Sequence, residues 1–97
     1  MTKHEIQKLI VPVLEKHNIV KASLFGSFVR NEQNEMSDID LLVEFRKGKS
    51  LLDLISLKNE IEVITKRKTD ILTYKSINPM LKESILSEEE LIYEERP

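Results

Sequence analysis

The stretch GSFVRNEQNEMSDIDLLVEF, residues 26–45, joins a glycine-serine pair to two closely spaced aspartates at the start of an apolar run. Asp38 and Asp40 are separated by one residue, so in an extended strand both carboxylates point to the same face, roughly 6.5 to 7 Å apart. At an effective dielectric constant near 20, two unit charges at that distance repel by roughly 2 kcal/mol. A divalent cation offsets this repulsion, because magnesium prefers carboxylate and phosphate oxygens. The pair therefore predicts a metal site, although Asp38 also fits a turn residue and Asp40 a solvated acid on the face of a strand.

Two further features belong to the same predicted site. Gly26 and Ser27 end a short apolar segment, where a glycine lets backbone N–H groups approach a phosphate and the serine adds a hydroxyl. On its own this pair also fits an ordinary turn. Asp70, in the segment KTDIL, starts another short apolar run. If the strands that carry Asp40 and Asp70 are neighbours, three carboxylates meet at one edge of the sheet and suit a two-metal site for phosphoryl transfer.

The composition limits the classes of function. The chain has 15 Lys and Arg against 17 Asp and Glu, which gives a net charge of -2 and no general attraction to nucleic acid or to anionic membranes. It has no cysteine, which excludes disulfides, thiolate zinc sites and cysteine nucleophiles and favours a reducing compartment. The sequence shows neither a signal peptide nor a membrane-spanning run. We expect a soluble, cytoplasmic chain with one domain over residues 1–97 and no direct contact with nucleic acid.

Periodicity and turn signals predict alternating helices and strands. Thr2 and Glu5 form a capping box ahead of an amphipathic helix, in which Pro12 should cause a kink or a restart. Leu51 begins a broad apolar stripe on a later helix, which we expect to be mostly core. The expected helices cover residues 2–17, 50–65 and 79–86, and the expected strands cover residues 20–25, 39–45, 68–74 and 91–93.

The pattern of Gly-Ser, ten residues and Asp-x-Asp resembles the signature of the nucleotidyltransferase superfamily that includes DNA polymerase beta. The segments ASLFGSFVRN, SDIDLLVEF, SLLDLISLKNEIE and RKTDIL, in this order and spacing, are similar to minimal nucleotidyltransferases, the MNT proteins encoded beside HEPN-domain proteins. This resemblance covers nearly the whole chain. It implies an α/β (α+β) fold, in which helices pack on a small mixed β-sheet like the palm of polymerase beta.

The resemblance implies a phosphate-binding turn. Gly26 and Ser27 would hold the triphosphate of a nucleotide, and Arg30 stands at the position of the family's arginine and would contact phosphate. Asn31 replaces a glycine that usually follows this arginine in the family, and asparagine tolerates a left-handed conformation. Lys66 likewise stands where a glycine commonly ends the long helix.

The resemblance also gives the acids catalytic roles. Asp38 and Asp40 would bind Mg²⁺ and the nucleotide, and Asp70 would complete the two-metal site as a ligand or as the base for the incoming hydroxyl. The activity that this implies is Mg²⁺-dependent transfer of AMP from ATP to a hydroxyl, with release of pyrophosphate.

By the same resemblance, the partner is a HEPN-domain toxin, the acceptor is one of its tyrosines, and this chain is the antitoxin of the pair. A second interpretation is a non-catalytic antitoxin that neutralises a HEPN ribonuclease by binding alone. A third is transfer to a small hydroxylated molecule such as an aminoglycoside. It is disfavoured because the chain has little length with which to build the walls of such a pocket.

Overall fold

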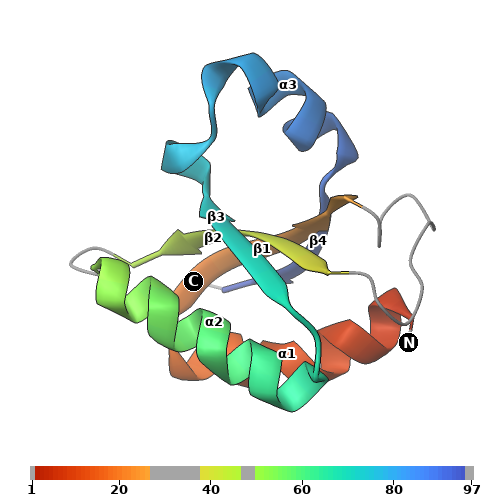
Figure 1. Ribbon diagram of the computed structural model, residues 1–97, viewed down its shortest axis with the longest axis vertical. Helices are drawn as coiled ribbons and strands as arrows, with labels where there is room; N and C mark the ends of the chain where they lie inside the picture. Colours follow the sequence, from red (N-terminus) through yellow and green to blue (C-terminus); the bar gives the residue numbers. More distant parts are fainter. Residues whose placement is uncertain (1, 27–37, 47–49, 96–97) are drawn as a thin grey trace.

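The computed structural model describes residues 2–26, 38–46 and 50–95 (Figure 1). Within these residues, four strands form one sheet in the order β3-β2-β1-β4. The strands, in chain order, are β1 (Ile19–Phe25), β2 (Ile39–Phe45), β3 (Thr69–Thr73) and β4 (Glu90–Glu94). β1 lies antiparallel to β2 and β4, whereas β3 lies parallel to β2. The sheet is therefore mixed, which confirms the predicted fold class.

Two helices cover one face of this sheet, and a third stands on the opposite side (Figure 1). The helices, in chain order, are α1 (Lys3–Lys16), α2 (Leu51–Thr65), the short 3-10 helix η2 (Tyr74–Ser76) and α3 (Pro79–Glu88). α1 and α2 pack on each other and on the sheet, whereas none of the α3 residues is buried. The face that α1 and α2 leave open is thus bordered by α3.

α1 begins where the sequence predicts it. The Glu5 N–H donates to the Thr2 hydroxyl at 3.2 Å, and the Thr2 N–H donates to the Glu5 carboxylate at 3.2 Å, so the capping box is present. Of the expected kink or restart at Pro12, the structure excludes the restart, because α1 continues through this residue to Lys16. Pro12 and Lys8 are both exposed, so water can satisfy the Lys8 carbonyl that the proline leaves without its usual donor.

α2 contributes less to the core than its apolar stripe predicts. Its buried residues are Leu57, Ile61 and Thr65, whereas Leu52 and Val63 remain 76% and 78% exposed. The helix is apolar on more sides than the sheet and α1 can cover. It ends at Lys66, whose φ of 57° is the left-handed conformation that a glycine adopts most easily.

β2 divides the molecule into a packed side and an open side. Ile39, Leu41 and Val43 are fully buried against the helical layer, where they join the core of α1, α2 and β1. Asp40 alternates with them and so points to the other face, next to β3. The burial of one face therefore decides where the acid stands on the other.

A pair of leucines on α2 tests this assignment of the core. Leu57→Ala removes a fully buried side chain and should lower the free energy of unfolding by about 2 to 5 kcal/mol. Leu52→Ala makes the same chemical change at an exposed position of the same helix and should stay within about 0.5 kcal/mol of the unchanged chain. Urea unfolding followed by circular dichroism measures both, and equal losses would contradict the assignment.

Candidate functional site

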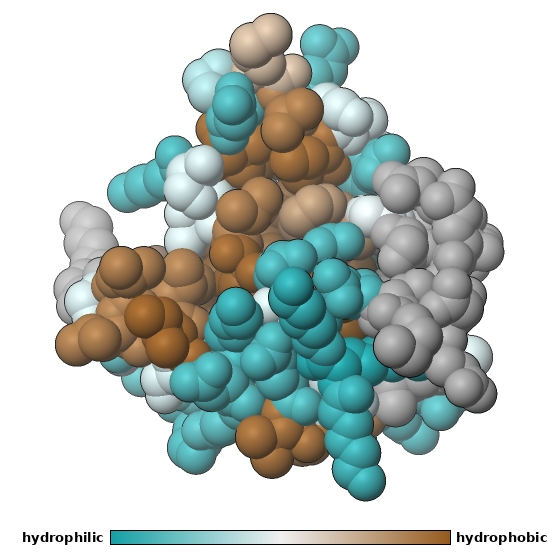
Figure 2. Space-filling model, viewed as in Figure 1, coloured by the Kyte–Doolittle hydropathy of each residue, from teal (hydrophilic) through white to brown (hydrophobic). Residues whose placement is uncertain are grey.

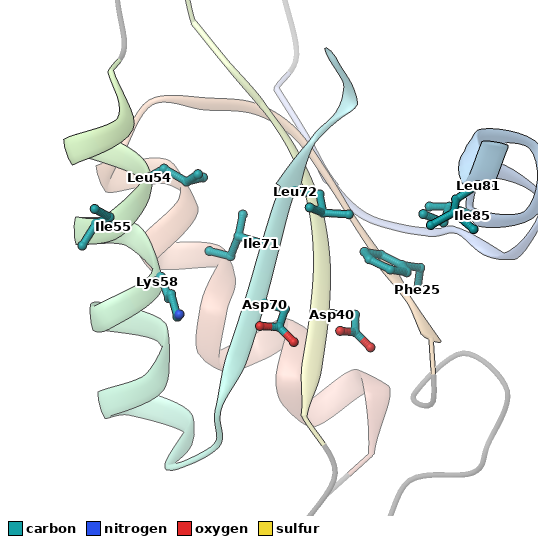
Figure 3. A pocket seen from close by; sticks show the side chains of 10 residues that line it. All are labelled: Phe25, Asp40, Leu54, Ile55, Lys58, Asp70, Ile71, Leu72, Leu81 and Ile85. Atoms are coloured by element: carbon teal, nitrogen blue, oxygen red, sulfur yellow. The ribbon is translucent and has the colours of Figure 1, made fainter. Parts of the chain in front are cut away.

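Two of the predicted acids stand side by side on the open face. Asp40 of β2 is the direct partner of Asp70 on β3 in the parallel register, and neighbouring strands lie about 4.8 Å apart. Figure 3 shows the two carboxylates next to each other, on the side of the sheet away from α1. Asp40 is half-buried and Asp70 is exposed. The structure thus brings together two acids that are 30 residues apart in the sequence.

Gly26 lies against Asp40 on the β1 side, opposite to Asp70. It follows β1, has a φ of +76°, and its backbone lies so near Asp40 that an added Cβ would stand 2.3 Å from the Asp40 Oδ2 atom. The left-handed conformation strains any larger residue here, and an added Cβ would have to displace the Asp40 carboxylate. The turn therefore brings backbone to the edge of the carboxylate, as expected of a turn that receives an anionic ligand.

Of the other predicted site residues, the structure describes only Asp38. Asp38 is half-buried and lies directly before β2, whereas Ser27, Arg30 and Asn31 lie outside the described residues. Among the residues that the structure does describe, no group of three or more histidine, cysteine, aspartate or glutamate side chains is close enough to hold a metal ion. Asp38 therefore does not form such a group with the other two acids.

The acid pair nevertheless has the chemistry of a magnesium site. Magnesium is commonly held by one or two carboxylates and completes its coordination with substrate phosphates and water. Asp40 and Asp70 supply the two carboxylates, and an incoming triphosphate would supply the remaining oxygens. The described residues thus fit an ion that binds together with a nucleotide, rather than a closed cage made of protein ligands alone.

A hollow of about 550 Å³ opens beside the acids (Figure 3). Apart from Asp40, Asp70 and Lys58, its walls are apolar side chains from β1, α2, β3 and α3. These are Phe25, Leu54, Ile55, Ile71, Leu72, Leu81 and Ile85. Its volume lies within the roughly 300 to 1,000 Å³ that is usual for ligand sites.

A hydrogen-bonded network that the sequence analysis missed ties the α3 segment to the open face. The Tyr74 hydroxyl donates to the Glu89 carboxylate at 2.8 Å and lies 3.0 Å from the hydroxyl of Ser23, which is fully buried on β1. Burial raises the pKa of Tyr74 to about 12; the Ser23 hydroxyl lowers it and Glu89 raises it. Because Tyr74 and Glu89 stand at the two ends of the α3 segment, this network holds the base of the segment on the sheet.

Sequence comparison places the chain among proteins of one family. The family described as Polymerase beta, Nucleotidyltransferase matches residues 8–97. A protein of Methanocaldococcus jannaschii, provisionally named a protein adenylyltransferase, is 56% identical over 88 residues, which cover 91% of this chain and 95% of that protein. The protein adenylyltransferase MntA of Thermococcus cleftensis is 29% identical over 92 residues, which cover 91% of this chain and 93% of that protein.

Solved structures share the fold. A protein provisionally described as a minimal nucleotidyltransferase is 34% identical, with a TM-score of 0.76 over 89% of this chain and 88% of that chain. A toxin-antitoxin complex with AMP-PNP gives 17% identity and a TM-score of 0.80, over 93% of this chain and 74% of that one. A chain in the structure of a tri-AMPylated Shewanella oneidensis HEPN toxin in complex with an MNT antitoxin is 15% identical. Its TM-score is 0.74, over 95% of this chain and 72% of that chain. The last two likenesses establish the fold alone.

No helix among the described residues is long and apolar enough to span a membrane.

Two reciprocal substitutions test the left-handed backbone at Gly26 and at Lys66. Gly26→Ala imposes a left-handed alanine and a clash with Asp40, so it should cost about 2 kcal/mol or more of unfolding free energy. Lys66→Gly does the opposite at the left-handed end of α2 and should stabilise the chain by up to about 1 kcal/mol. Chemical denaturation measures both. A neutral Gly26→Ala would show that the turn does not lie against the acid.

The Tyr74 network predicts a loss of stability at alkaline pH. The folded chain holds the Tyr74 proton more tightly than the unfolded chain, since its pKa is about 12 instead of 10.0. The resulting stabilisation is complete below pH 10 and disappears as the pH rises through 12. Tyr74→Phe should therefore weaken the pH dependence of the unfolding free energy between pH 9 and 11.5. Tyr93→Phe removes a phenol outside this network and is the control; an equal effect of both variants would contradict the assignment.

Proposed function

This chain belongs to the polymerase beta family of nucleotidyltransferases, and on that premise we propose that it transfers AMP from ATP to a hydroxyl of a HEPN-domain toxin. The observation that carries the proposal is the row formed by Gly26, Asp40 and Asp70 across three adjacent strands. This row offers a backbone turn for phosphates and two carboxylates for a cation. The relatives named as protein adenylyltransferases support the choice of a protein acceptor.

The proposed roles follow from position. Asp40 lies between the turn and the second acid, where it would hold Mg²⁺ together with the phosphates; Asp38 would assist from the residue before β2. Magnesium, when bound, neutralises charge on the phosphates and on the leaving pyrophosphate. Asp70 is exposed at the edge of the sheet, where it can accept the proton of an arriving hydroxyl. Ser27 and Arg30 remain proposed phosphate contacts.

The partner and the acceptor residue are proposed from the solved complexes. One of them contains an AMPylated HEPN toxin with its MNT antitoxin, and another contains an ATP analogue. We extend this pairing to the present chain, with a tyrosine as acceptor and neutralisation of the toxin as the result. In this role the chain would work where toxin and ATP meet, in the cytoplasm.

Neutralisation by binding alone is the second candidate, and the exposed apolar surface favours it. Figure 2 shows apolar side chains over the first turns of α2 and over α3. Leu51, Leu52 and Met80 are 70%, 76% and 91% exposed. A protein partner that covers these side chains would gain hydrophobic stabilisation whether or not AMP is transferred.

The decisive experiment is intact-mass spectrometry of this chain with ATP, Mg²⁺ and a HEPN-domain protein from the same organism. We expect AMP to be added to the HEPN protein. The double variant Asp38→Asn, Asp40→Asn removes both acids with little change of shape and should reduce the transfer rate by at least about 100-fold. Glu44→Gln is the matched control, because Glu44 lies exposed on the same strand and face as Asp40.

The three results separate the candidates. An adduct that disappears only in the double variant supports transfer that depends on Asp38 and Asp40. The second candidate, neutralisation by binding alone, is supported if a stable complex forms without any adduct and the double variant still neutralises the toxin. An equal loss of transfer in Glu44→Gln would mean that the total charge of the strand, rather than Asp38 and Asp40 in particular, is responsible.

A further inference from the structure

The hollow beside the acids continues around β3, which is an edge strand of the described sheet. Leu54 and Ile55 line it from α2, and Leu81 and Ile85 line it from α3. Figure 3 shows the two groups on opposite sides of β3, with the acids between them and below. The edge of the sheet thus runs through an apolar space that is open to solvent.

The order of the strands gives the site two sides. Gly26 follows β1 and lies against Asp40 of β2, while Asp70 stands beyond Asp40 on β3. If Gly26 receives the nucleotide phosphates, as the proposed function has it, the attacking hydroxyl has to arrive from the β3 side. In-line displacement requires the attacking and leaving groups on opposite sides of phosphorus. The hollow is the space on the acceptor side.

The backbone of β3 determines which of its groups face this space. The Ile39 N–H donates to the Lys68 C=O at 2.9 Å, which sets the phase of the parallel ladder. Successive residues then direct their N–H groups alternately toward β2 and away from it. The N–H groups of Thr69, Ile71 and Thr73 point away.

Two of these outward N–H groups are already satisfied within the chain. The Thr69 N–H donates to the Glu62 carboxylate at 2.8 Å, and the Thr73 N–H donates to the Ser76 hydroxyl at 3.1 Å. A peptide that added a full strand to this edge would have to displace both bonds. We therefore expect the acceptor to reach the acids as a side chain that enters across the edge.

Lys58 is the one basic side chain among the residues that line the hollow. It is half-buried on α2, and in Figure 3 its ammonium is directed down toward the level of Asp70. Within the part of the chain that the structure describes, no ion pair involves Lys58. Its charge therefore remains available to a ligand that enters the hollow and displaces water from it.

We propose that the hollow seats the ring of a tyrosine acceptor and that Lys58 stabilises the negative charge developing on its phenolic oxygen. This inference rests on the proposed function and adds a residue outside the glycine-serine and aspartate motifs. Apolar walls suit an aromatic ring, and a cation beside its oxygen suits a phenol that is being deprotonated. A serine or threonine side chain would leave the apolar walls uncovered.

The step balances as follows. The phenolic O–H proton passes to the Asp70 carboxylate, and the oxygen forms a bond to the α-phosphorus of ATP. The bond from that phosphorus to the oxygen bridging to the β-phosphorus breaks, and pyrophosphate leaves with its electron pair. Lys58 stays protonated throughout and acts by its charge alone.

A binding measurement tests the subsite without any turnover. We expect N-acetyl-tyrosinamide, titrated into the ¹⁵N-labelled chain, to shift the amide signals of Ile55, Lys58 and Ile71, and N-acetyl-serinamide to leave them in place. Ile55→Glu puts a charge on the wall and should abolish the shifts, while Val63→Glu does so at an exposed α2 position that does not line this hollow and should not. Equal shifts with both amides, or none with either, would overturn the subsite.

Kinetics with the HEPN-domain protein test Lys58 itself. Lys58→Met should lower kcat for AMP transfer roughly 100-fold, move the pH-rate profile to higher pH and leave the Kd for ATP within about twofold. Lys58→Arg keeps the charge and should restore much of the rate. Lys8→Met removes an exposed charge from α1 and is the control. A Lys58→Met variant that loses ATP affinity instead of kcat would place the ammonium on the phosphate side and overturn the proposal.

The two proposals fail in different ways. If the unchanged chain adds no AMP to the HEPN protein, the proposed function fails, and the titration with the tyrosine amide alone decides whether the subsite exists. If transfer occurs and Lys58→Met transfers at the normal rate, the proposed function stands and the role of Lys58 is wrong.

Discussion

The parallel register of β2 and β3 sets two carboxylates opposite each other, and the rest of the molecule is arranged around that constraint. Like charges that stand directly opposite each other on neighbouring strands destabilise a sheet. The register is nevertheless held, because a slip of one residue would turn Ile39, Leu41 and Val43 from the core to the open face. The apolar half of β2 thus keeps the acids together.

One face of the sheet stays open because the three helices pack differently against it. α1 and α2 fill the core on one side, while α3 stands off the other side and forms a wall of the hollow. Tyr74, Ser23 and Glu89 fasten the base of the α3 segment with hydrogen bonds instead of apolar packing. A packed α3 would have covered Asp40 and Asp70. The polar fastening leaves space above them while it keeps the wall in position.

Local signals in the sequence predict the elements well and the site only in part. The Thr2 capping box and the bounds of β2 follow from neighbouring residues, and the structure confirms both. The meeting of Asp40 and Asp70 depends on which strands pair, and alternation within one strand carries no such information.

Other features depend on contacts that no short stretch of sequence contains. Tyr74 meets Ser23 across 51 residues, so a local motif could not reveal the network. The exposure of Leu52 on α2 depends on how much of the helix α1 and the sheet can cover. Lys58 lies within an ordinary helical pattern, and only the tertiary structure shows that it lines the same hollow as Asp70 of β3. Any ligand that binds the folded chain at the acids and the apolar walls would stabilise the fold, by about 2.7 kcal/mol at one hundred times its Kd. Under the proposed function, stability and substrate binding would therefore be coupled through the same few residues.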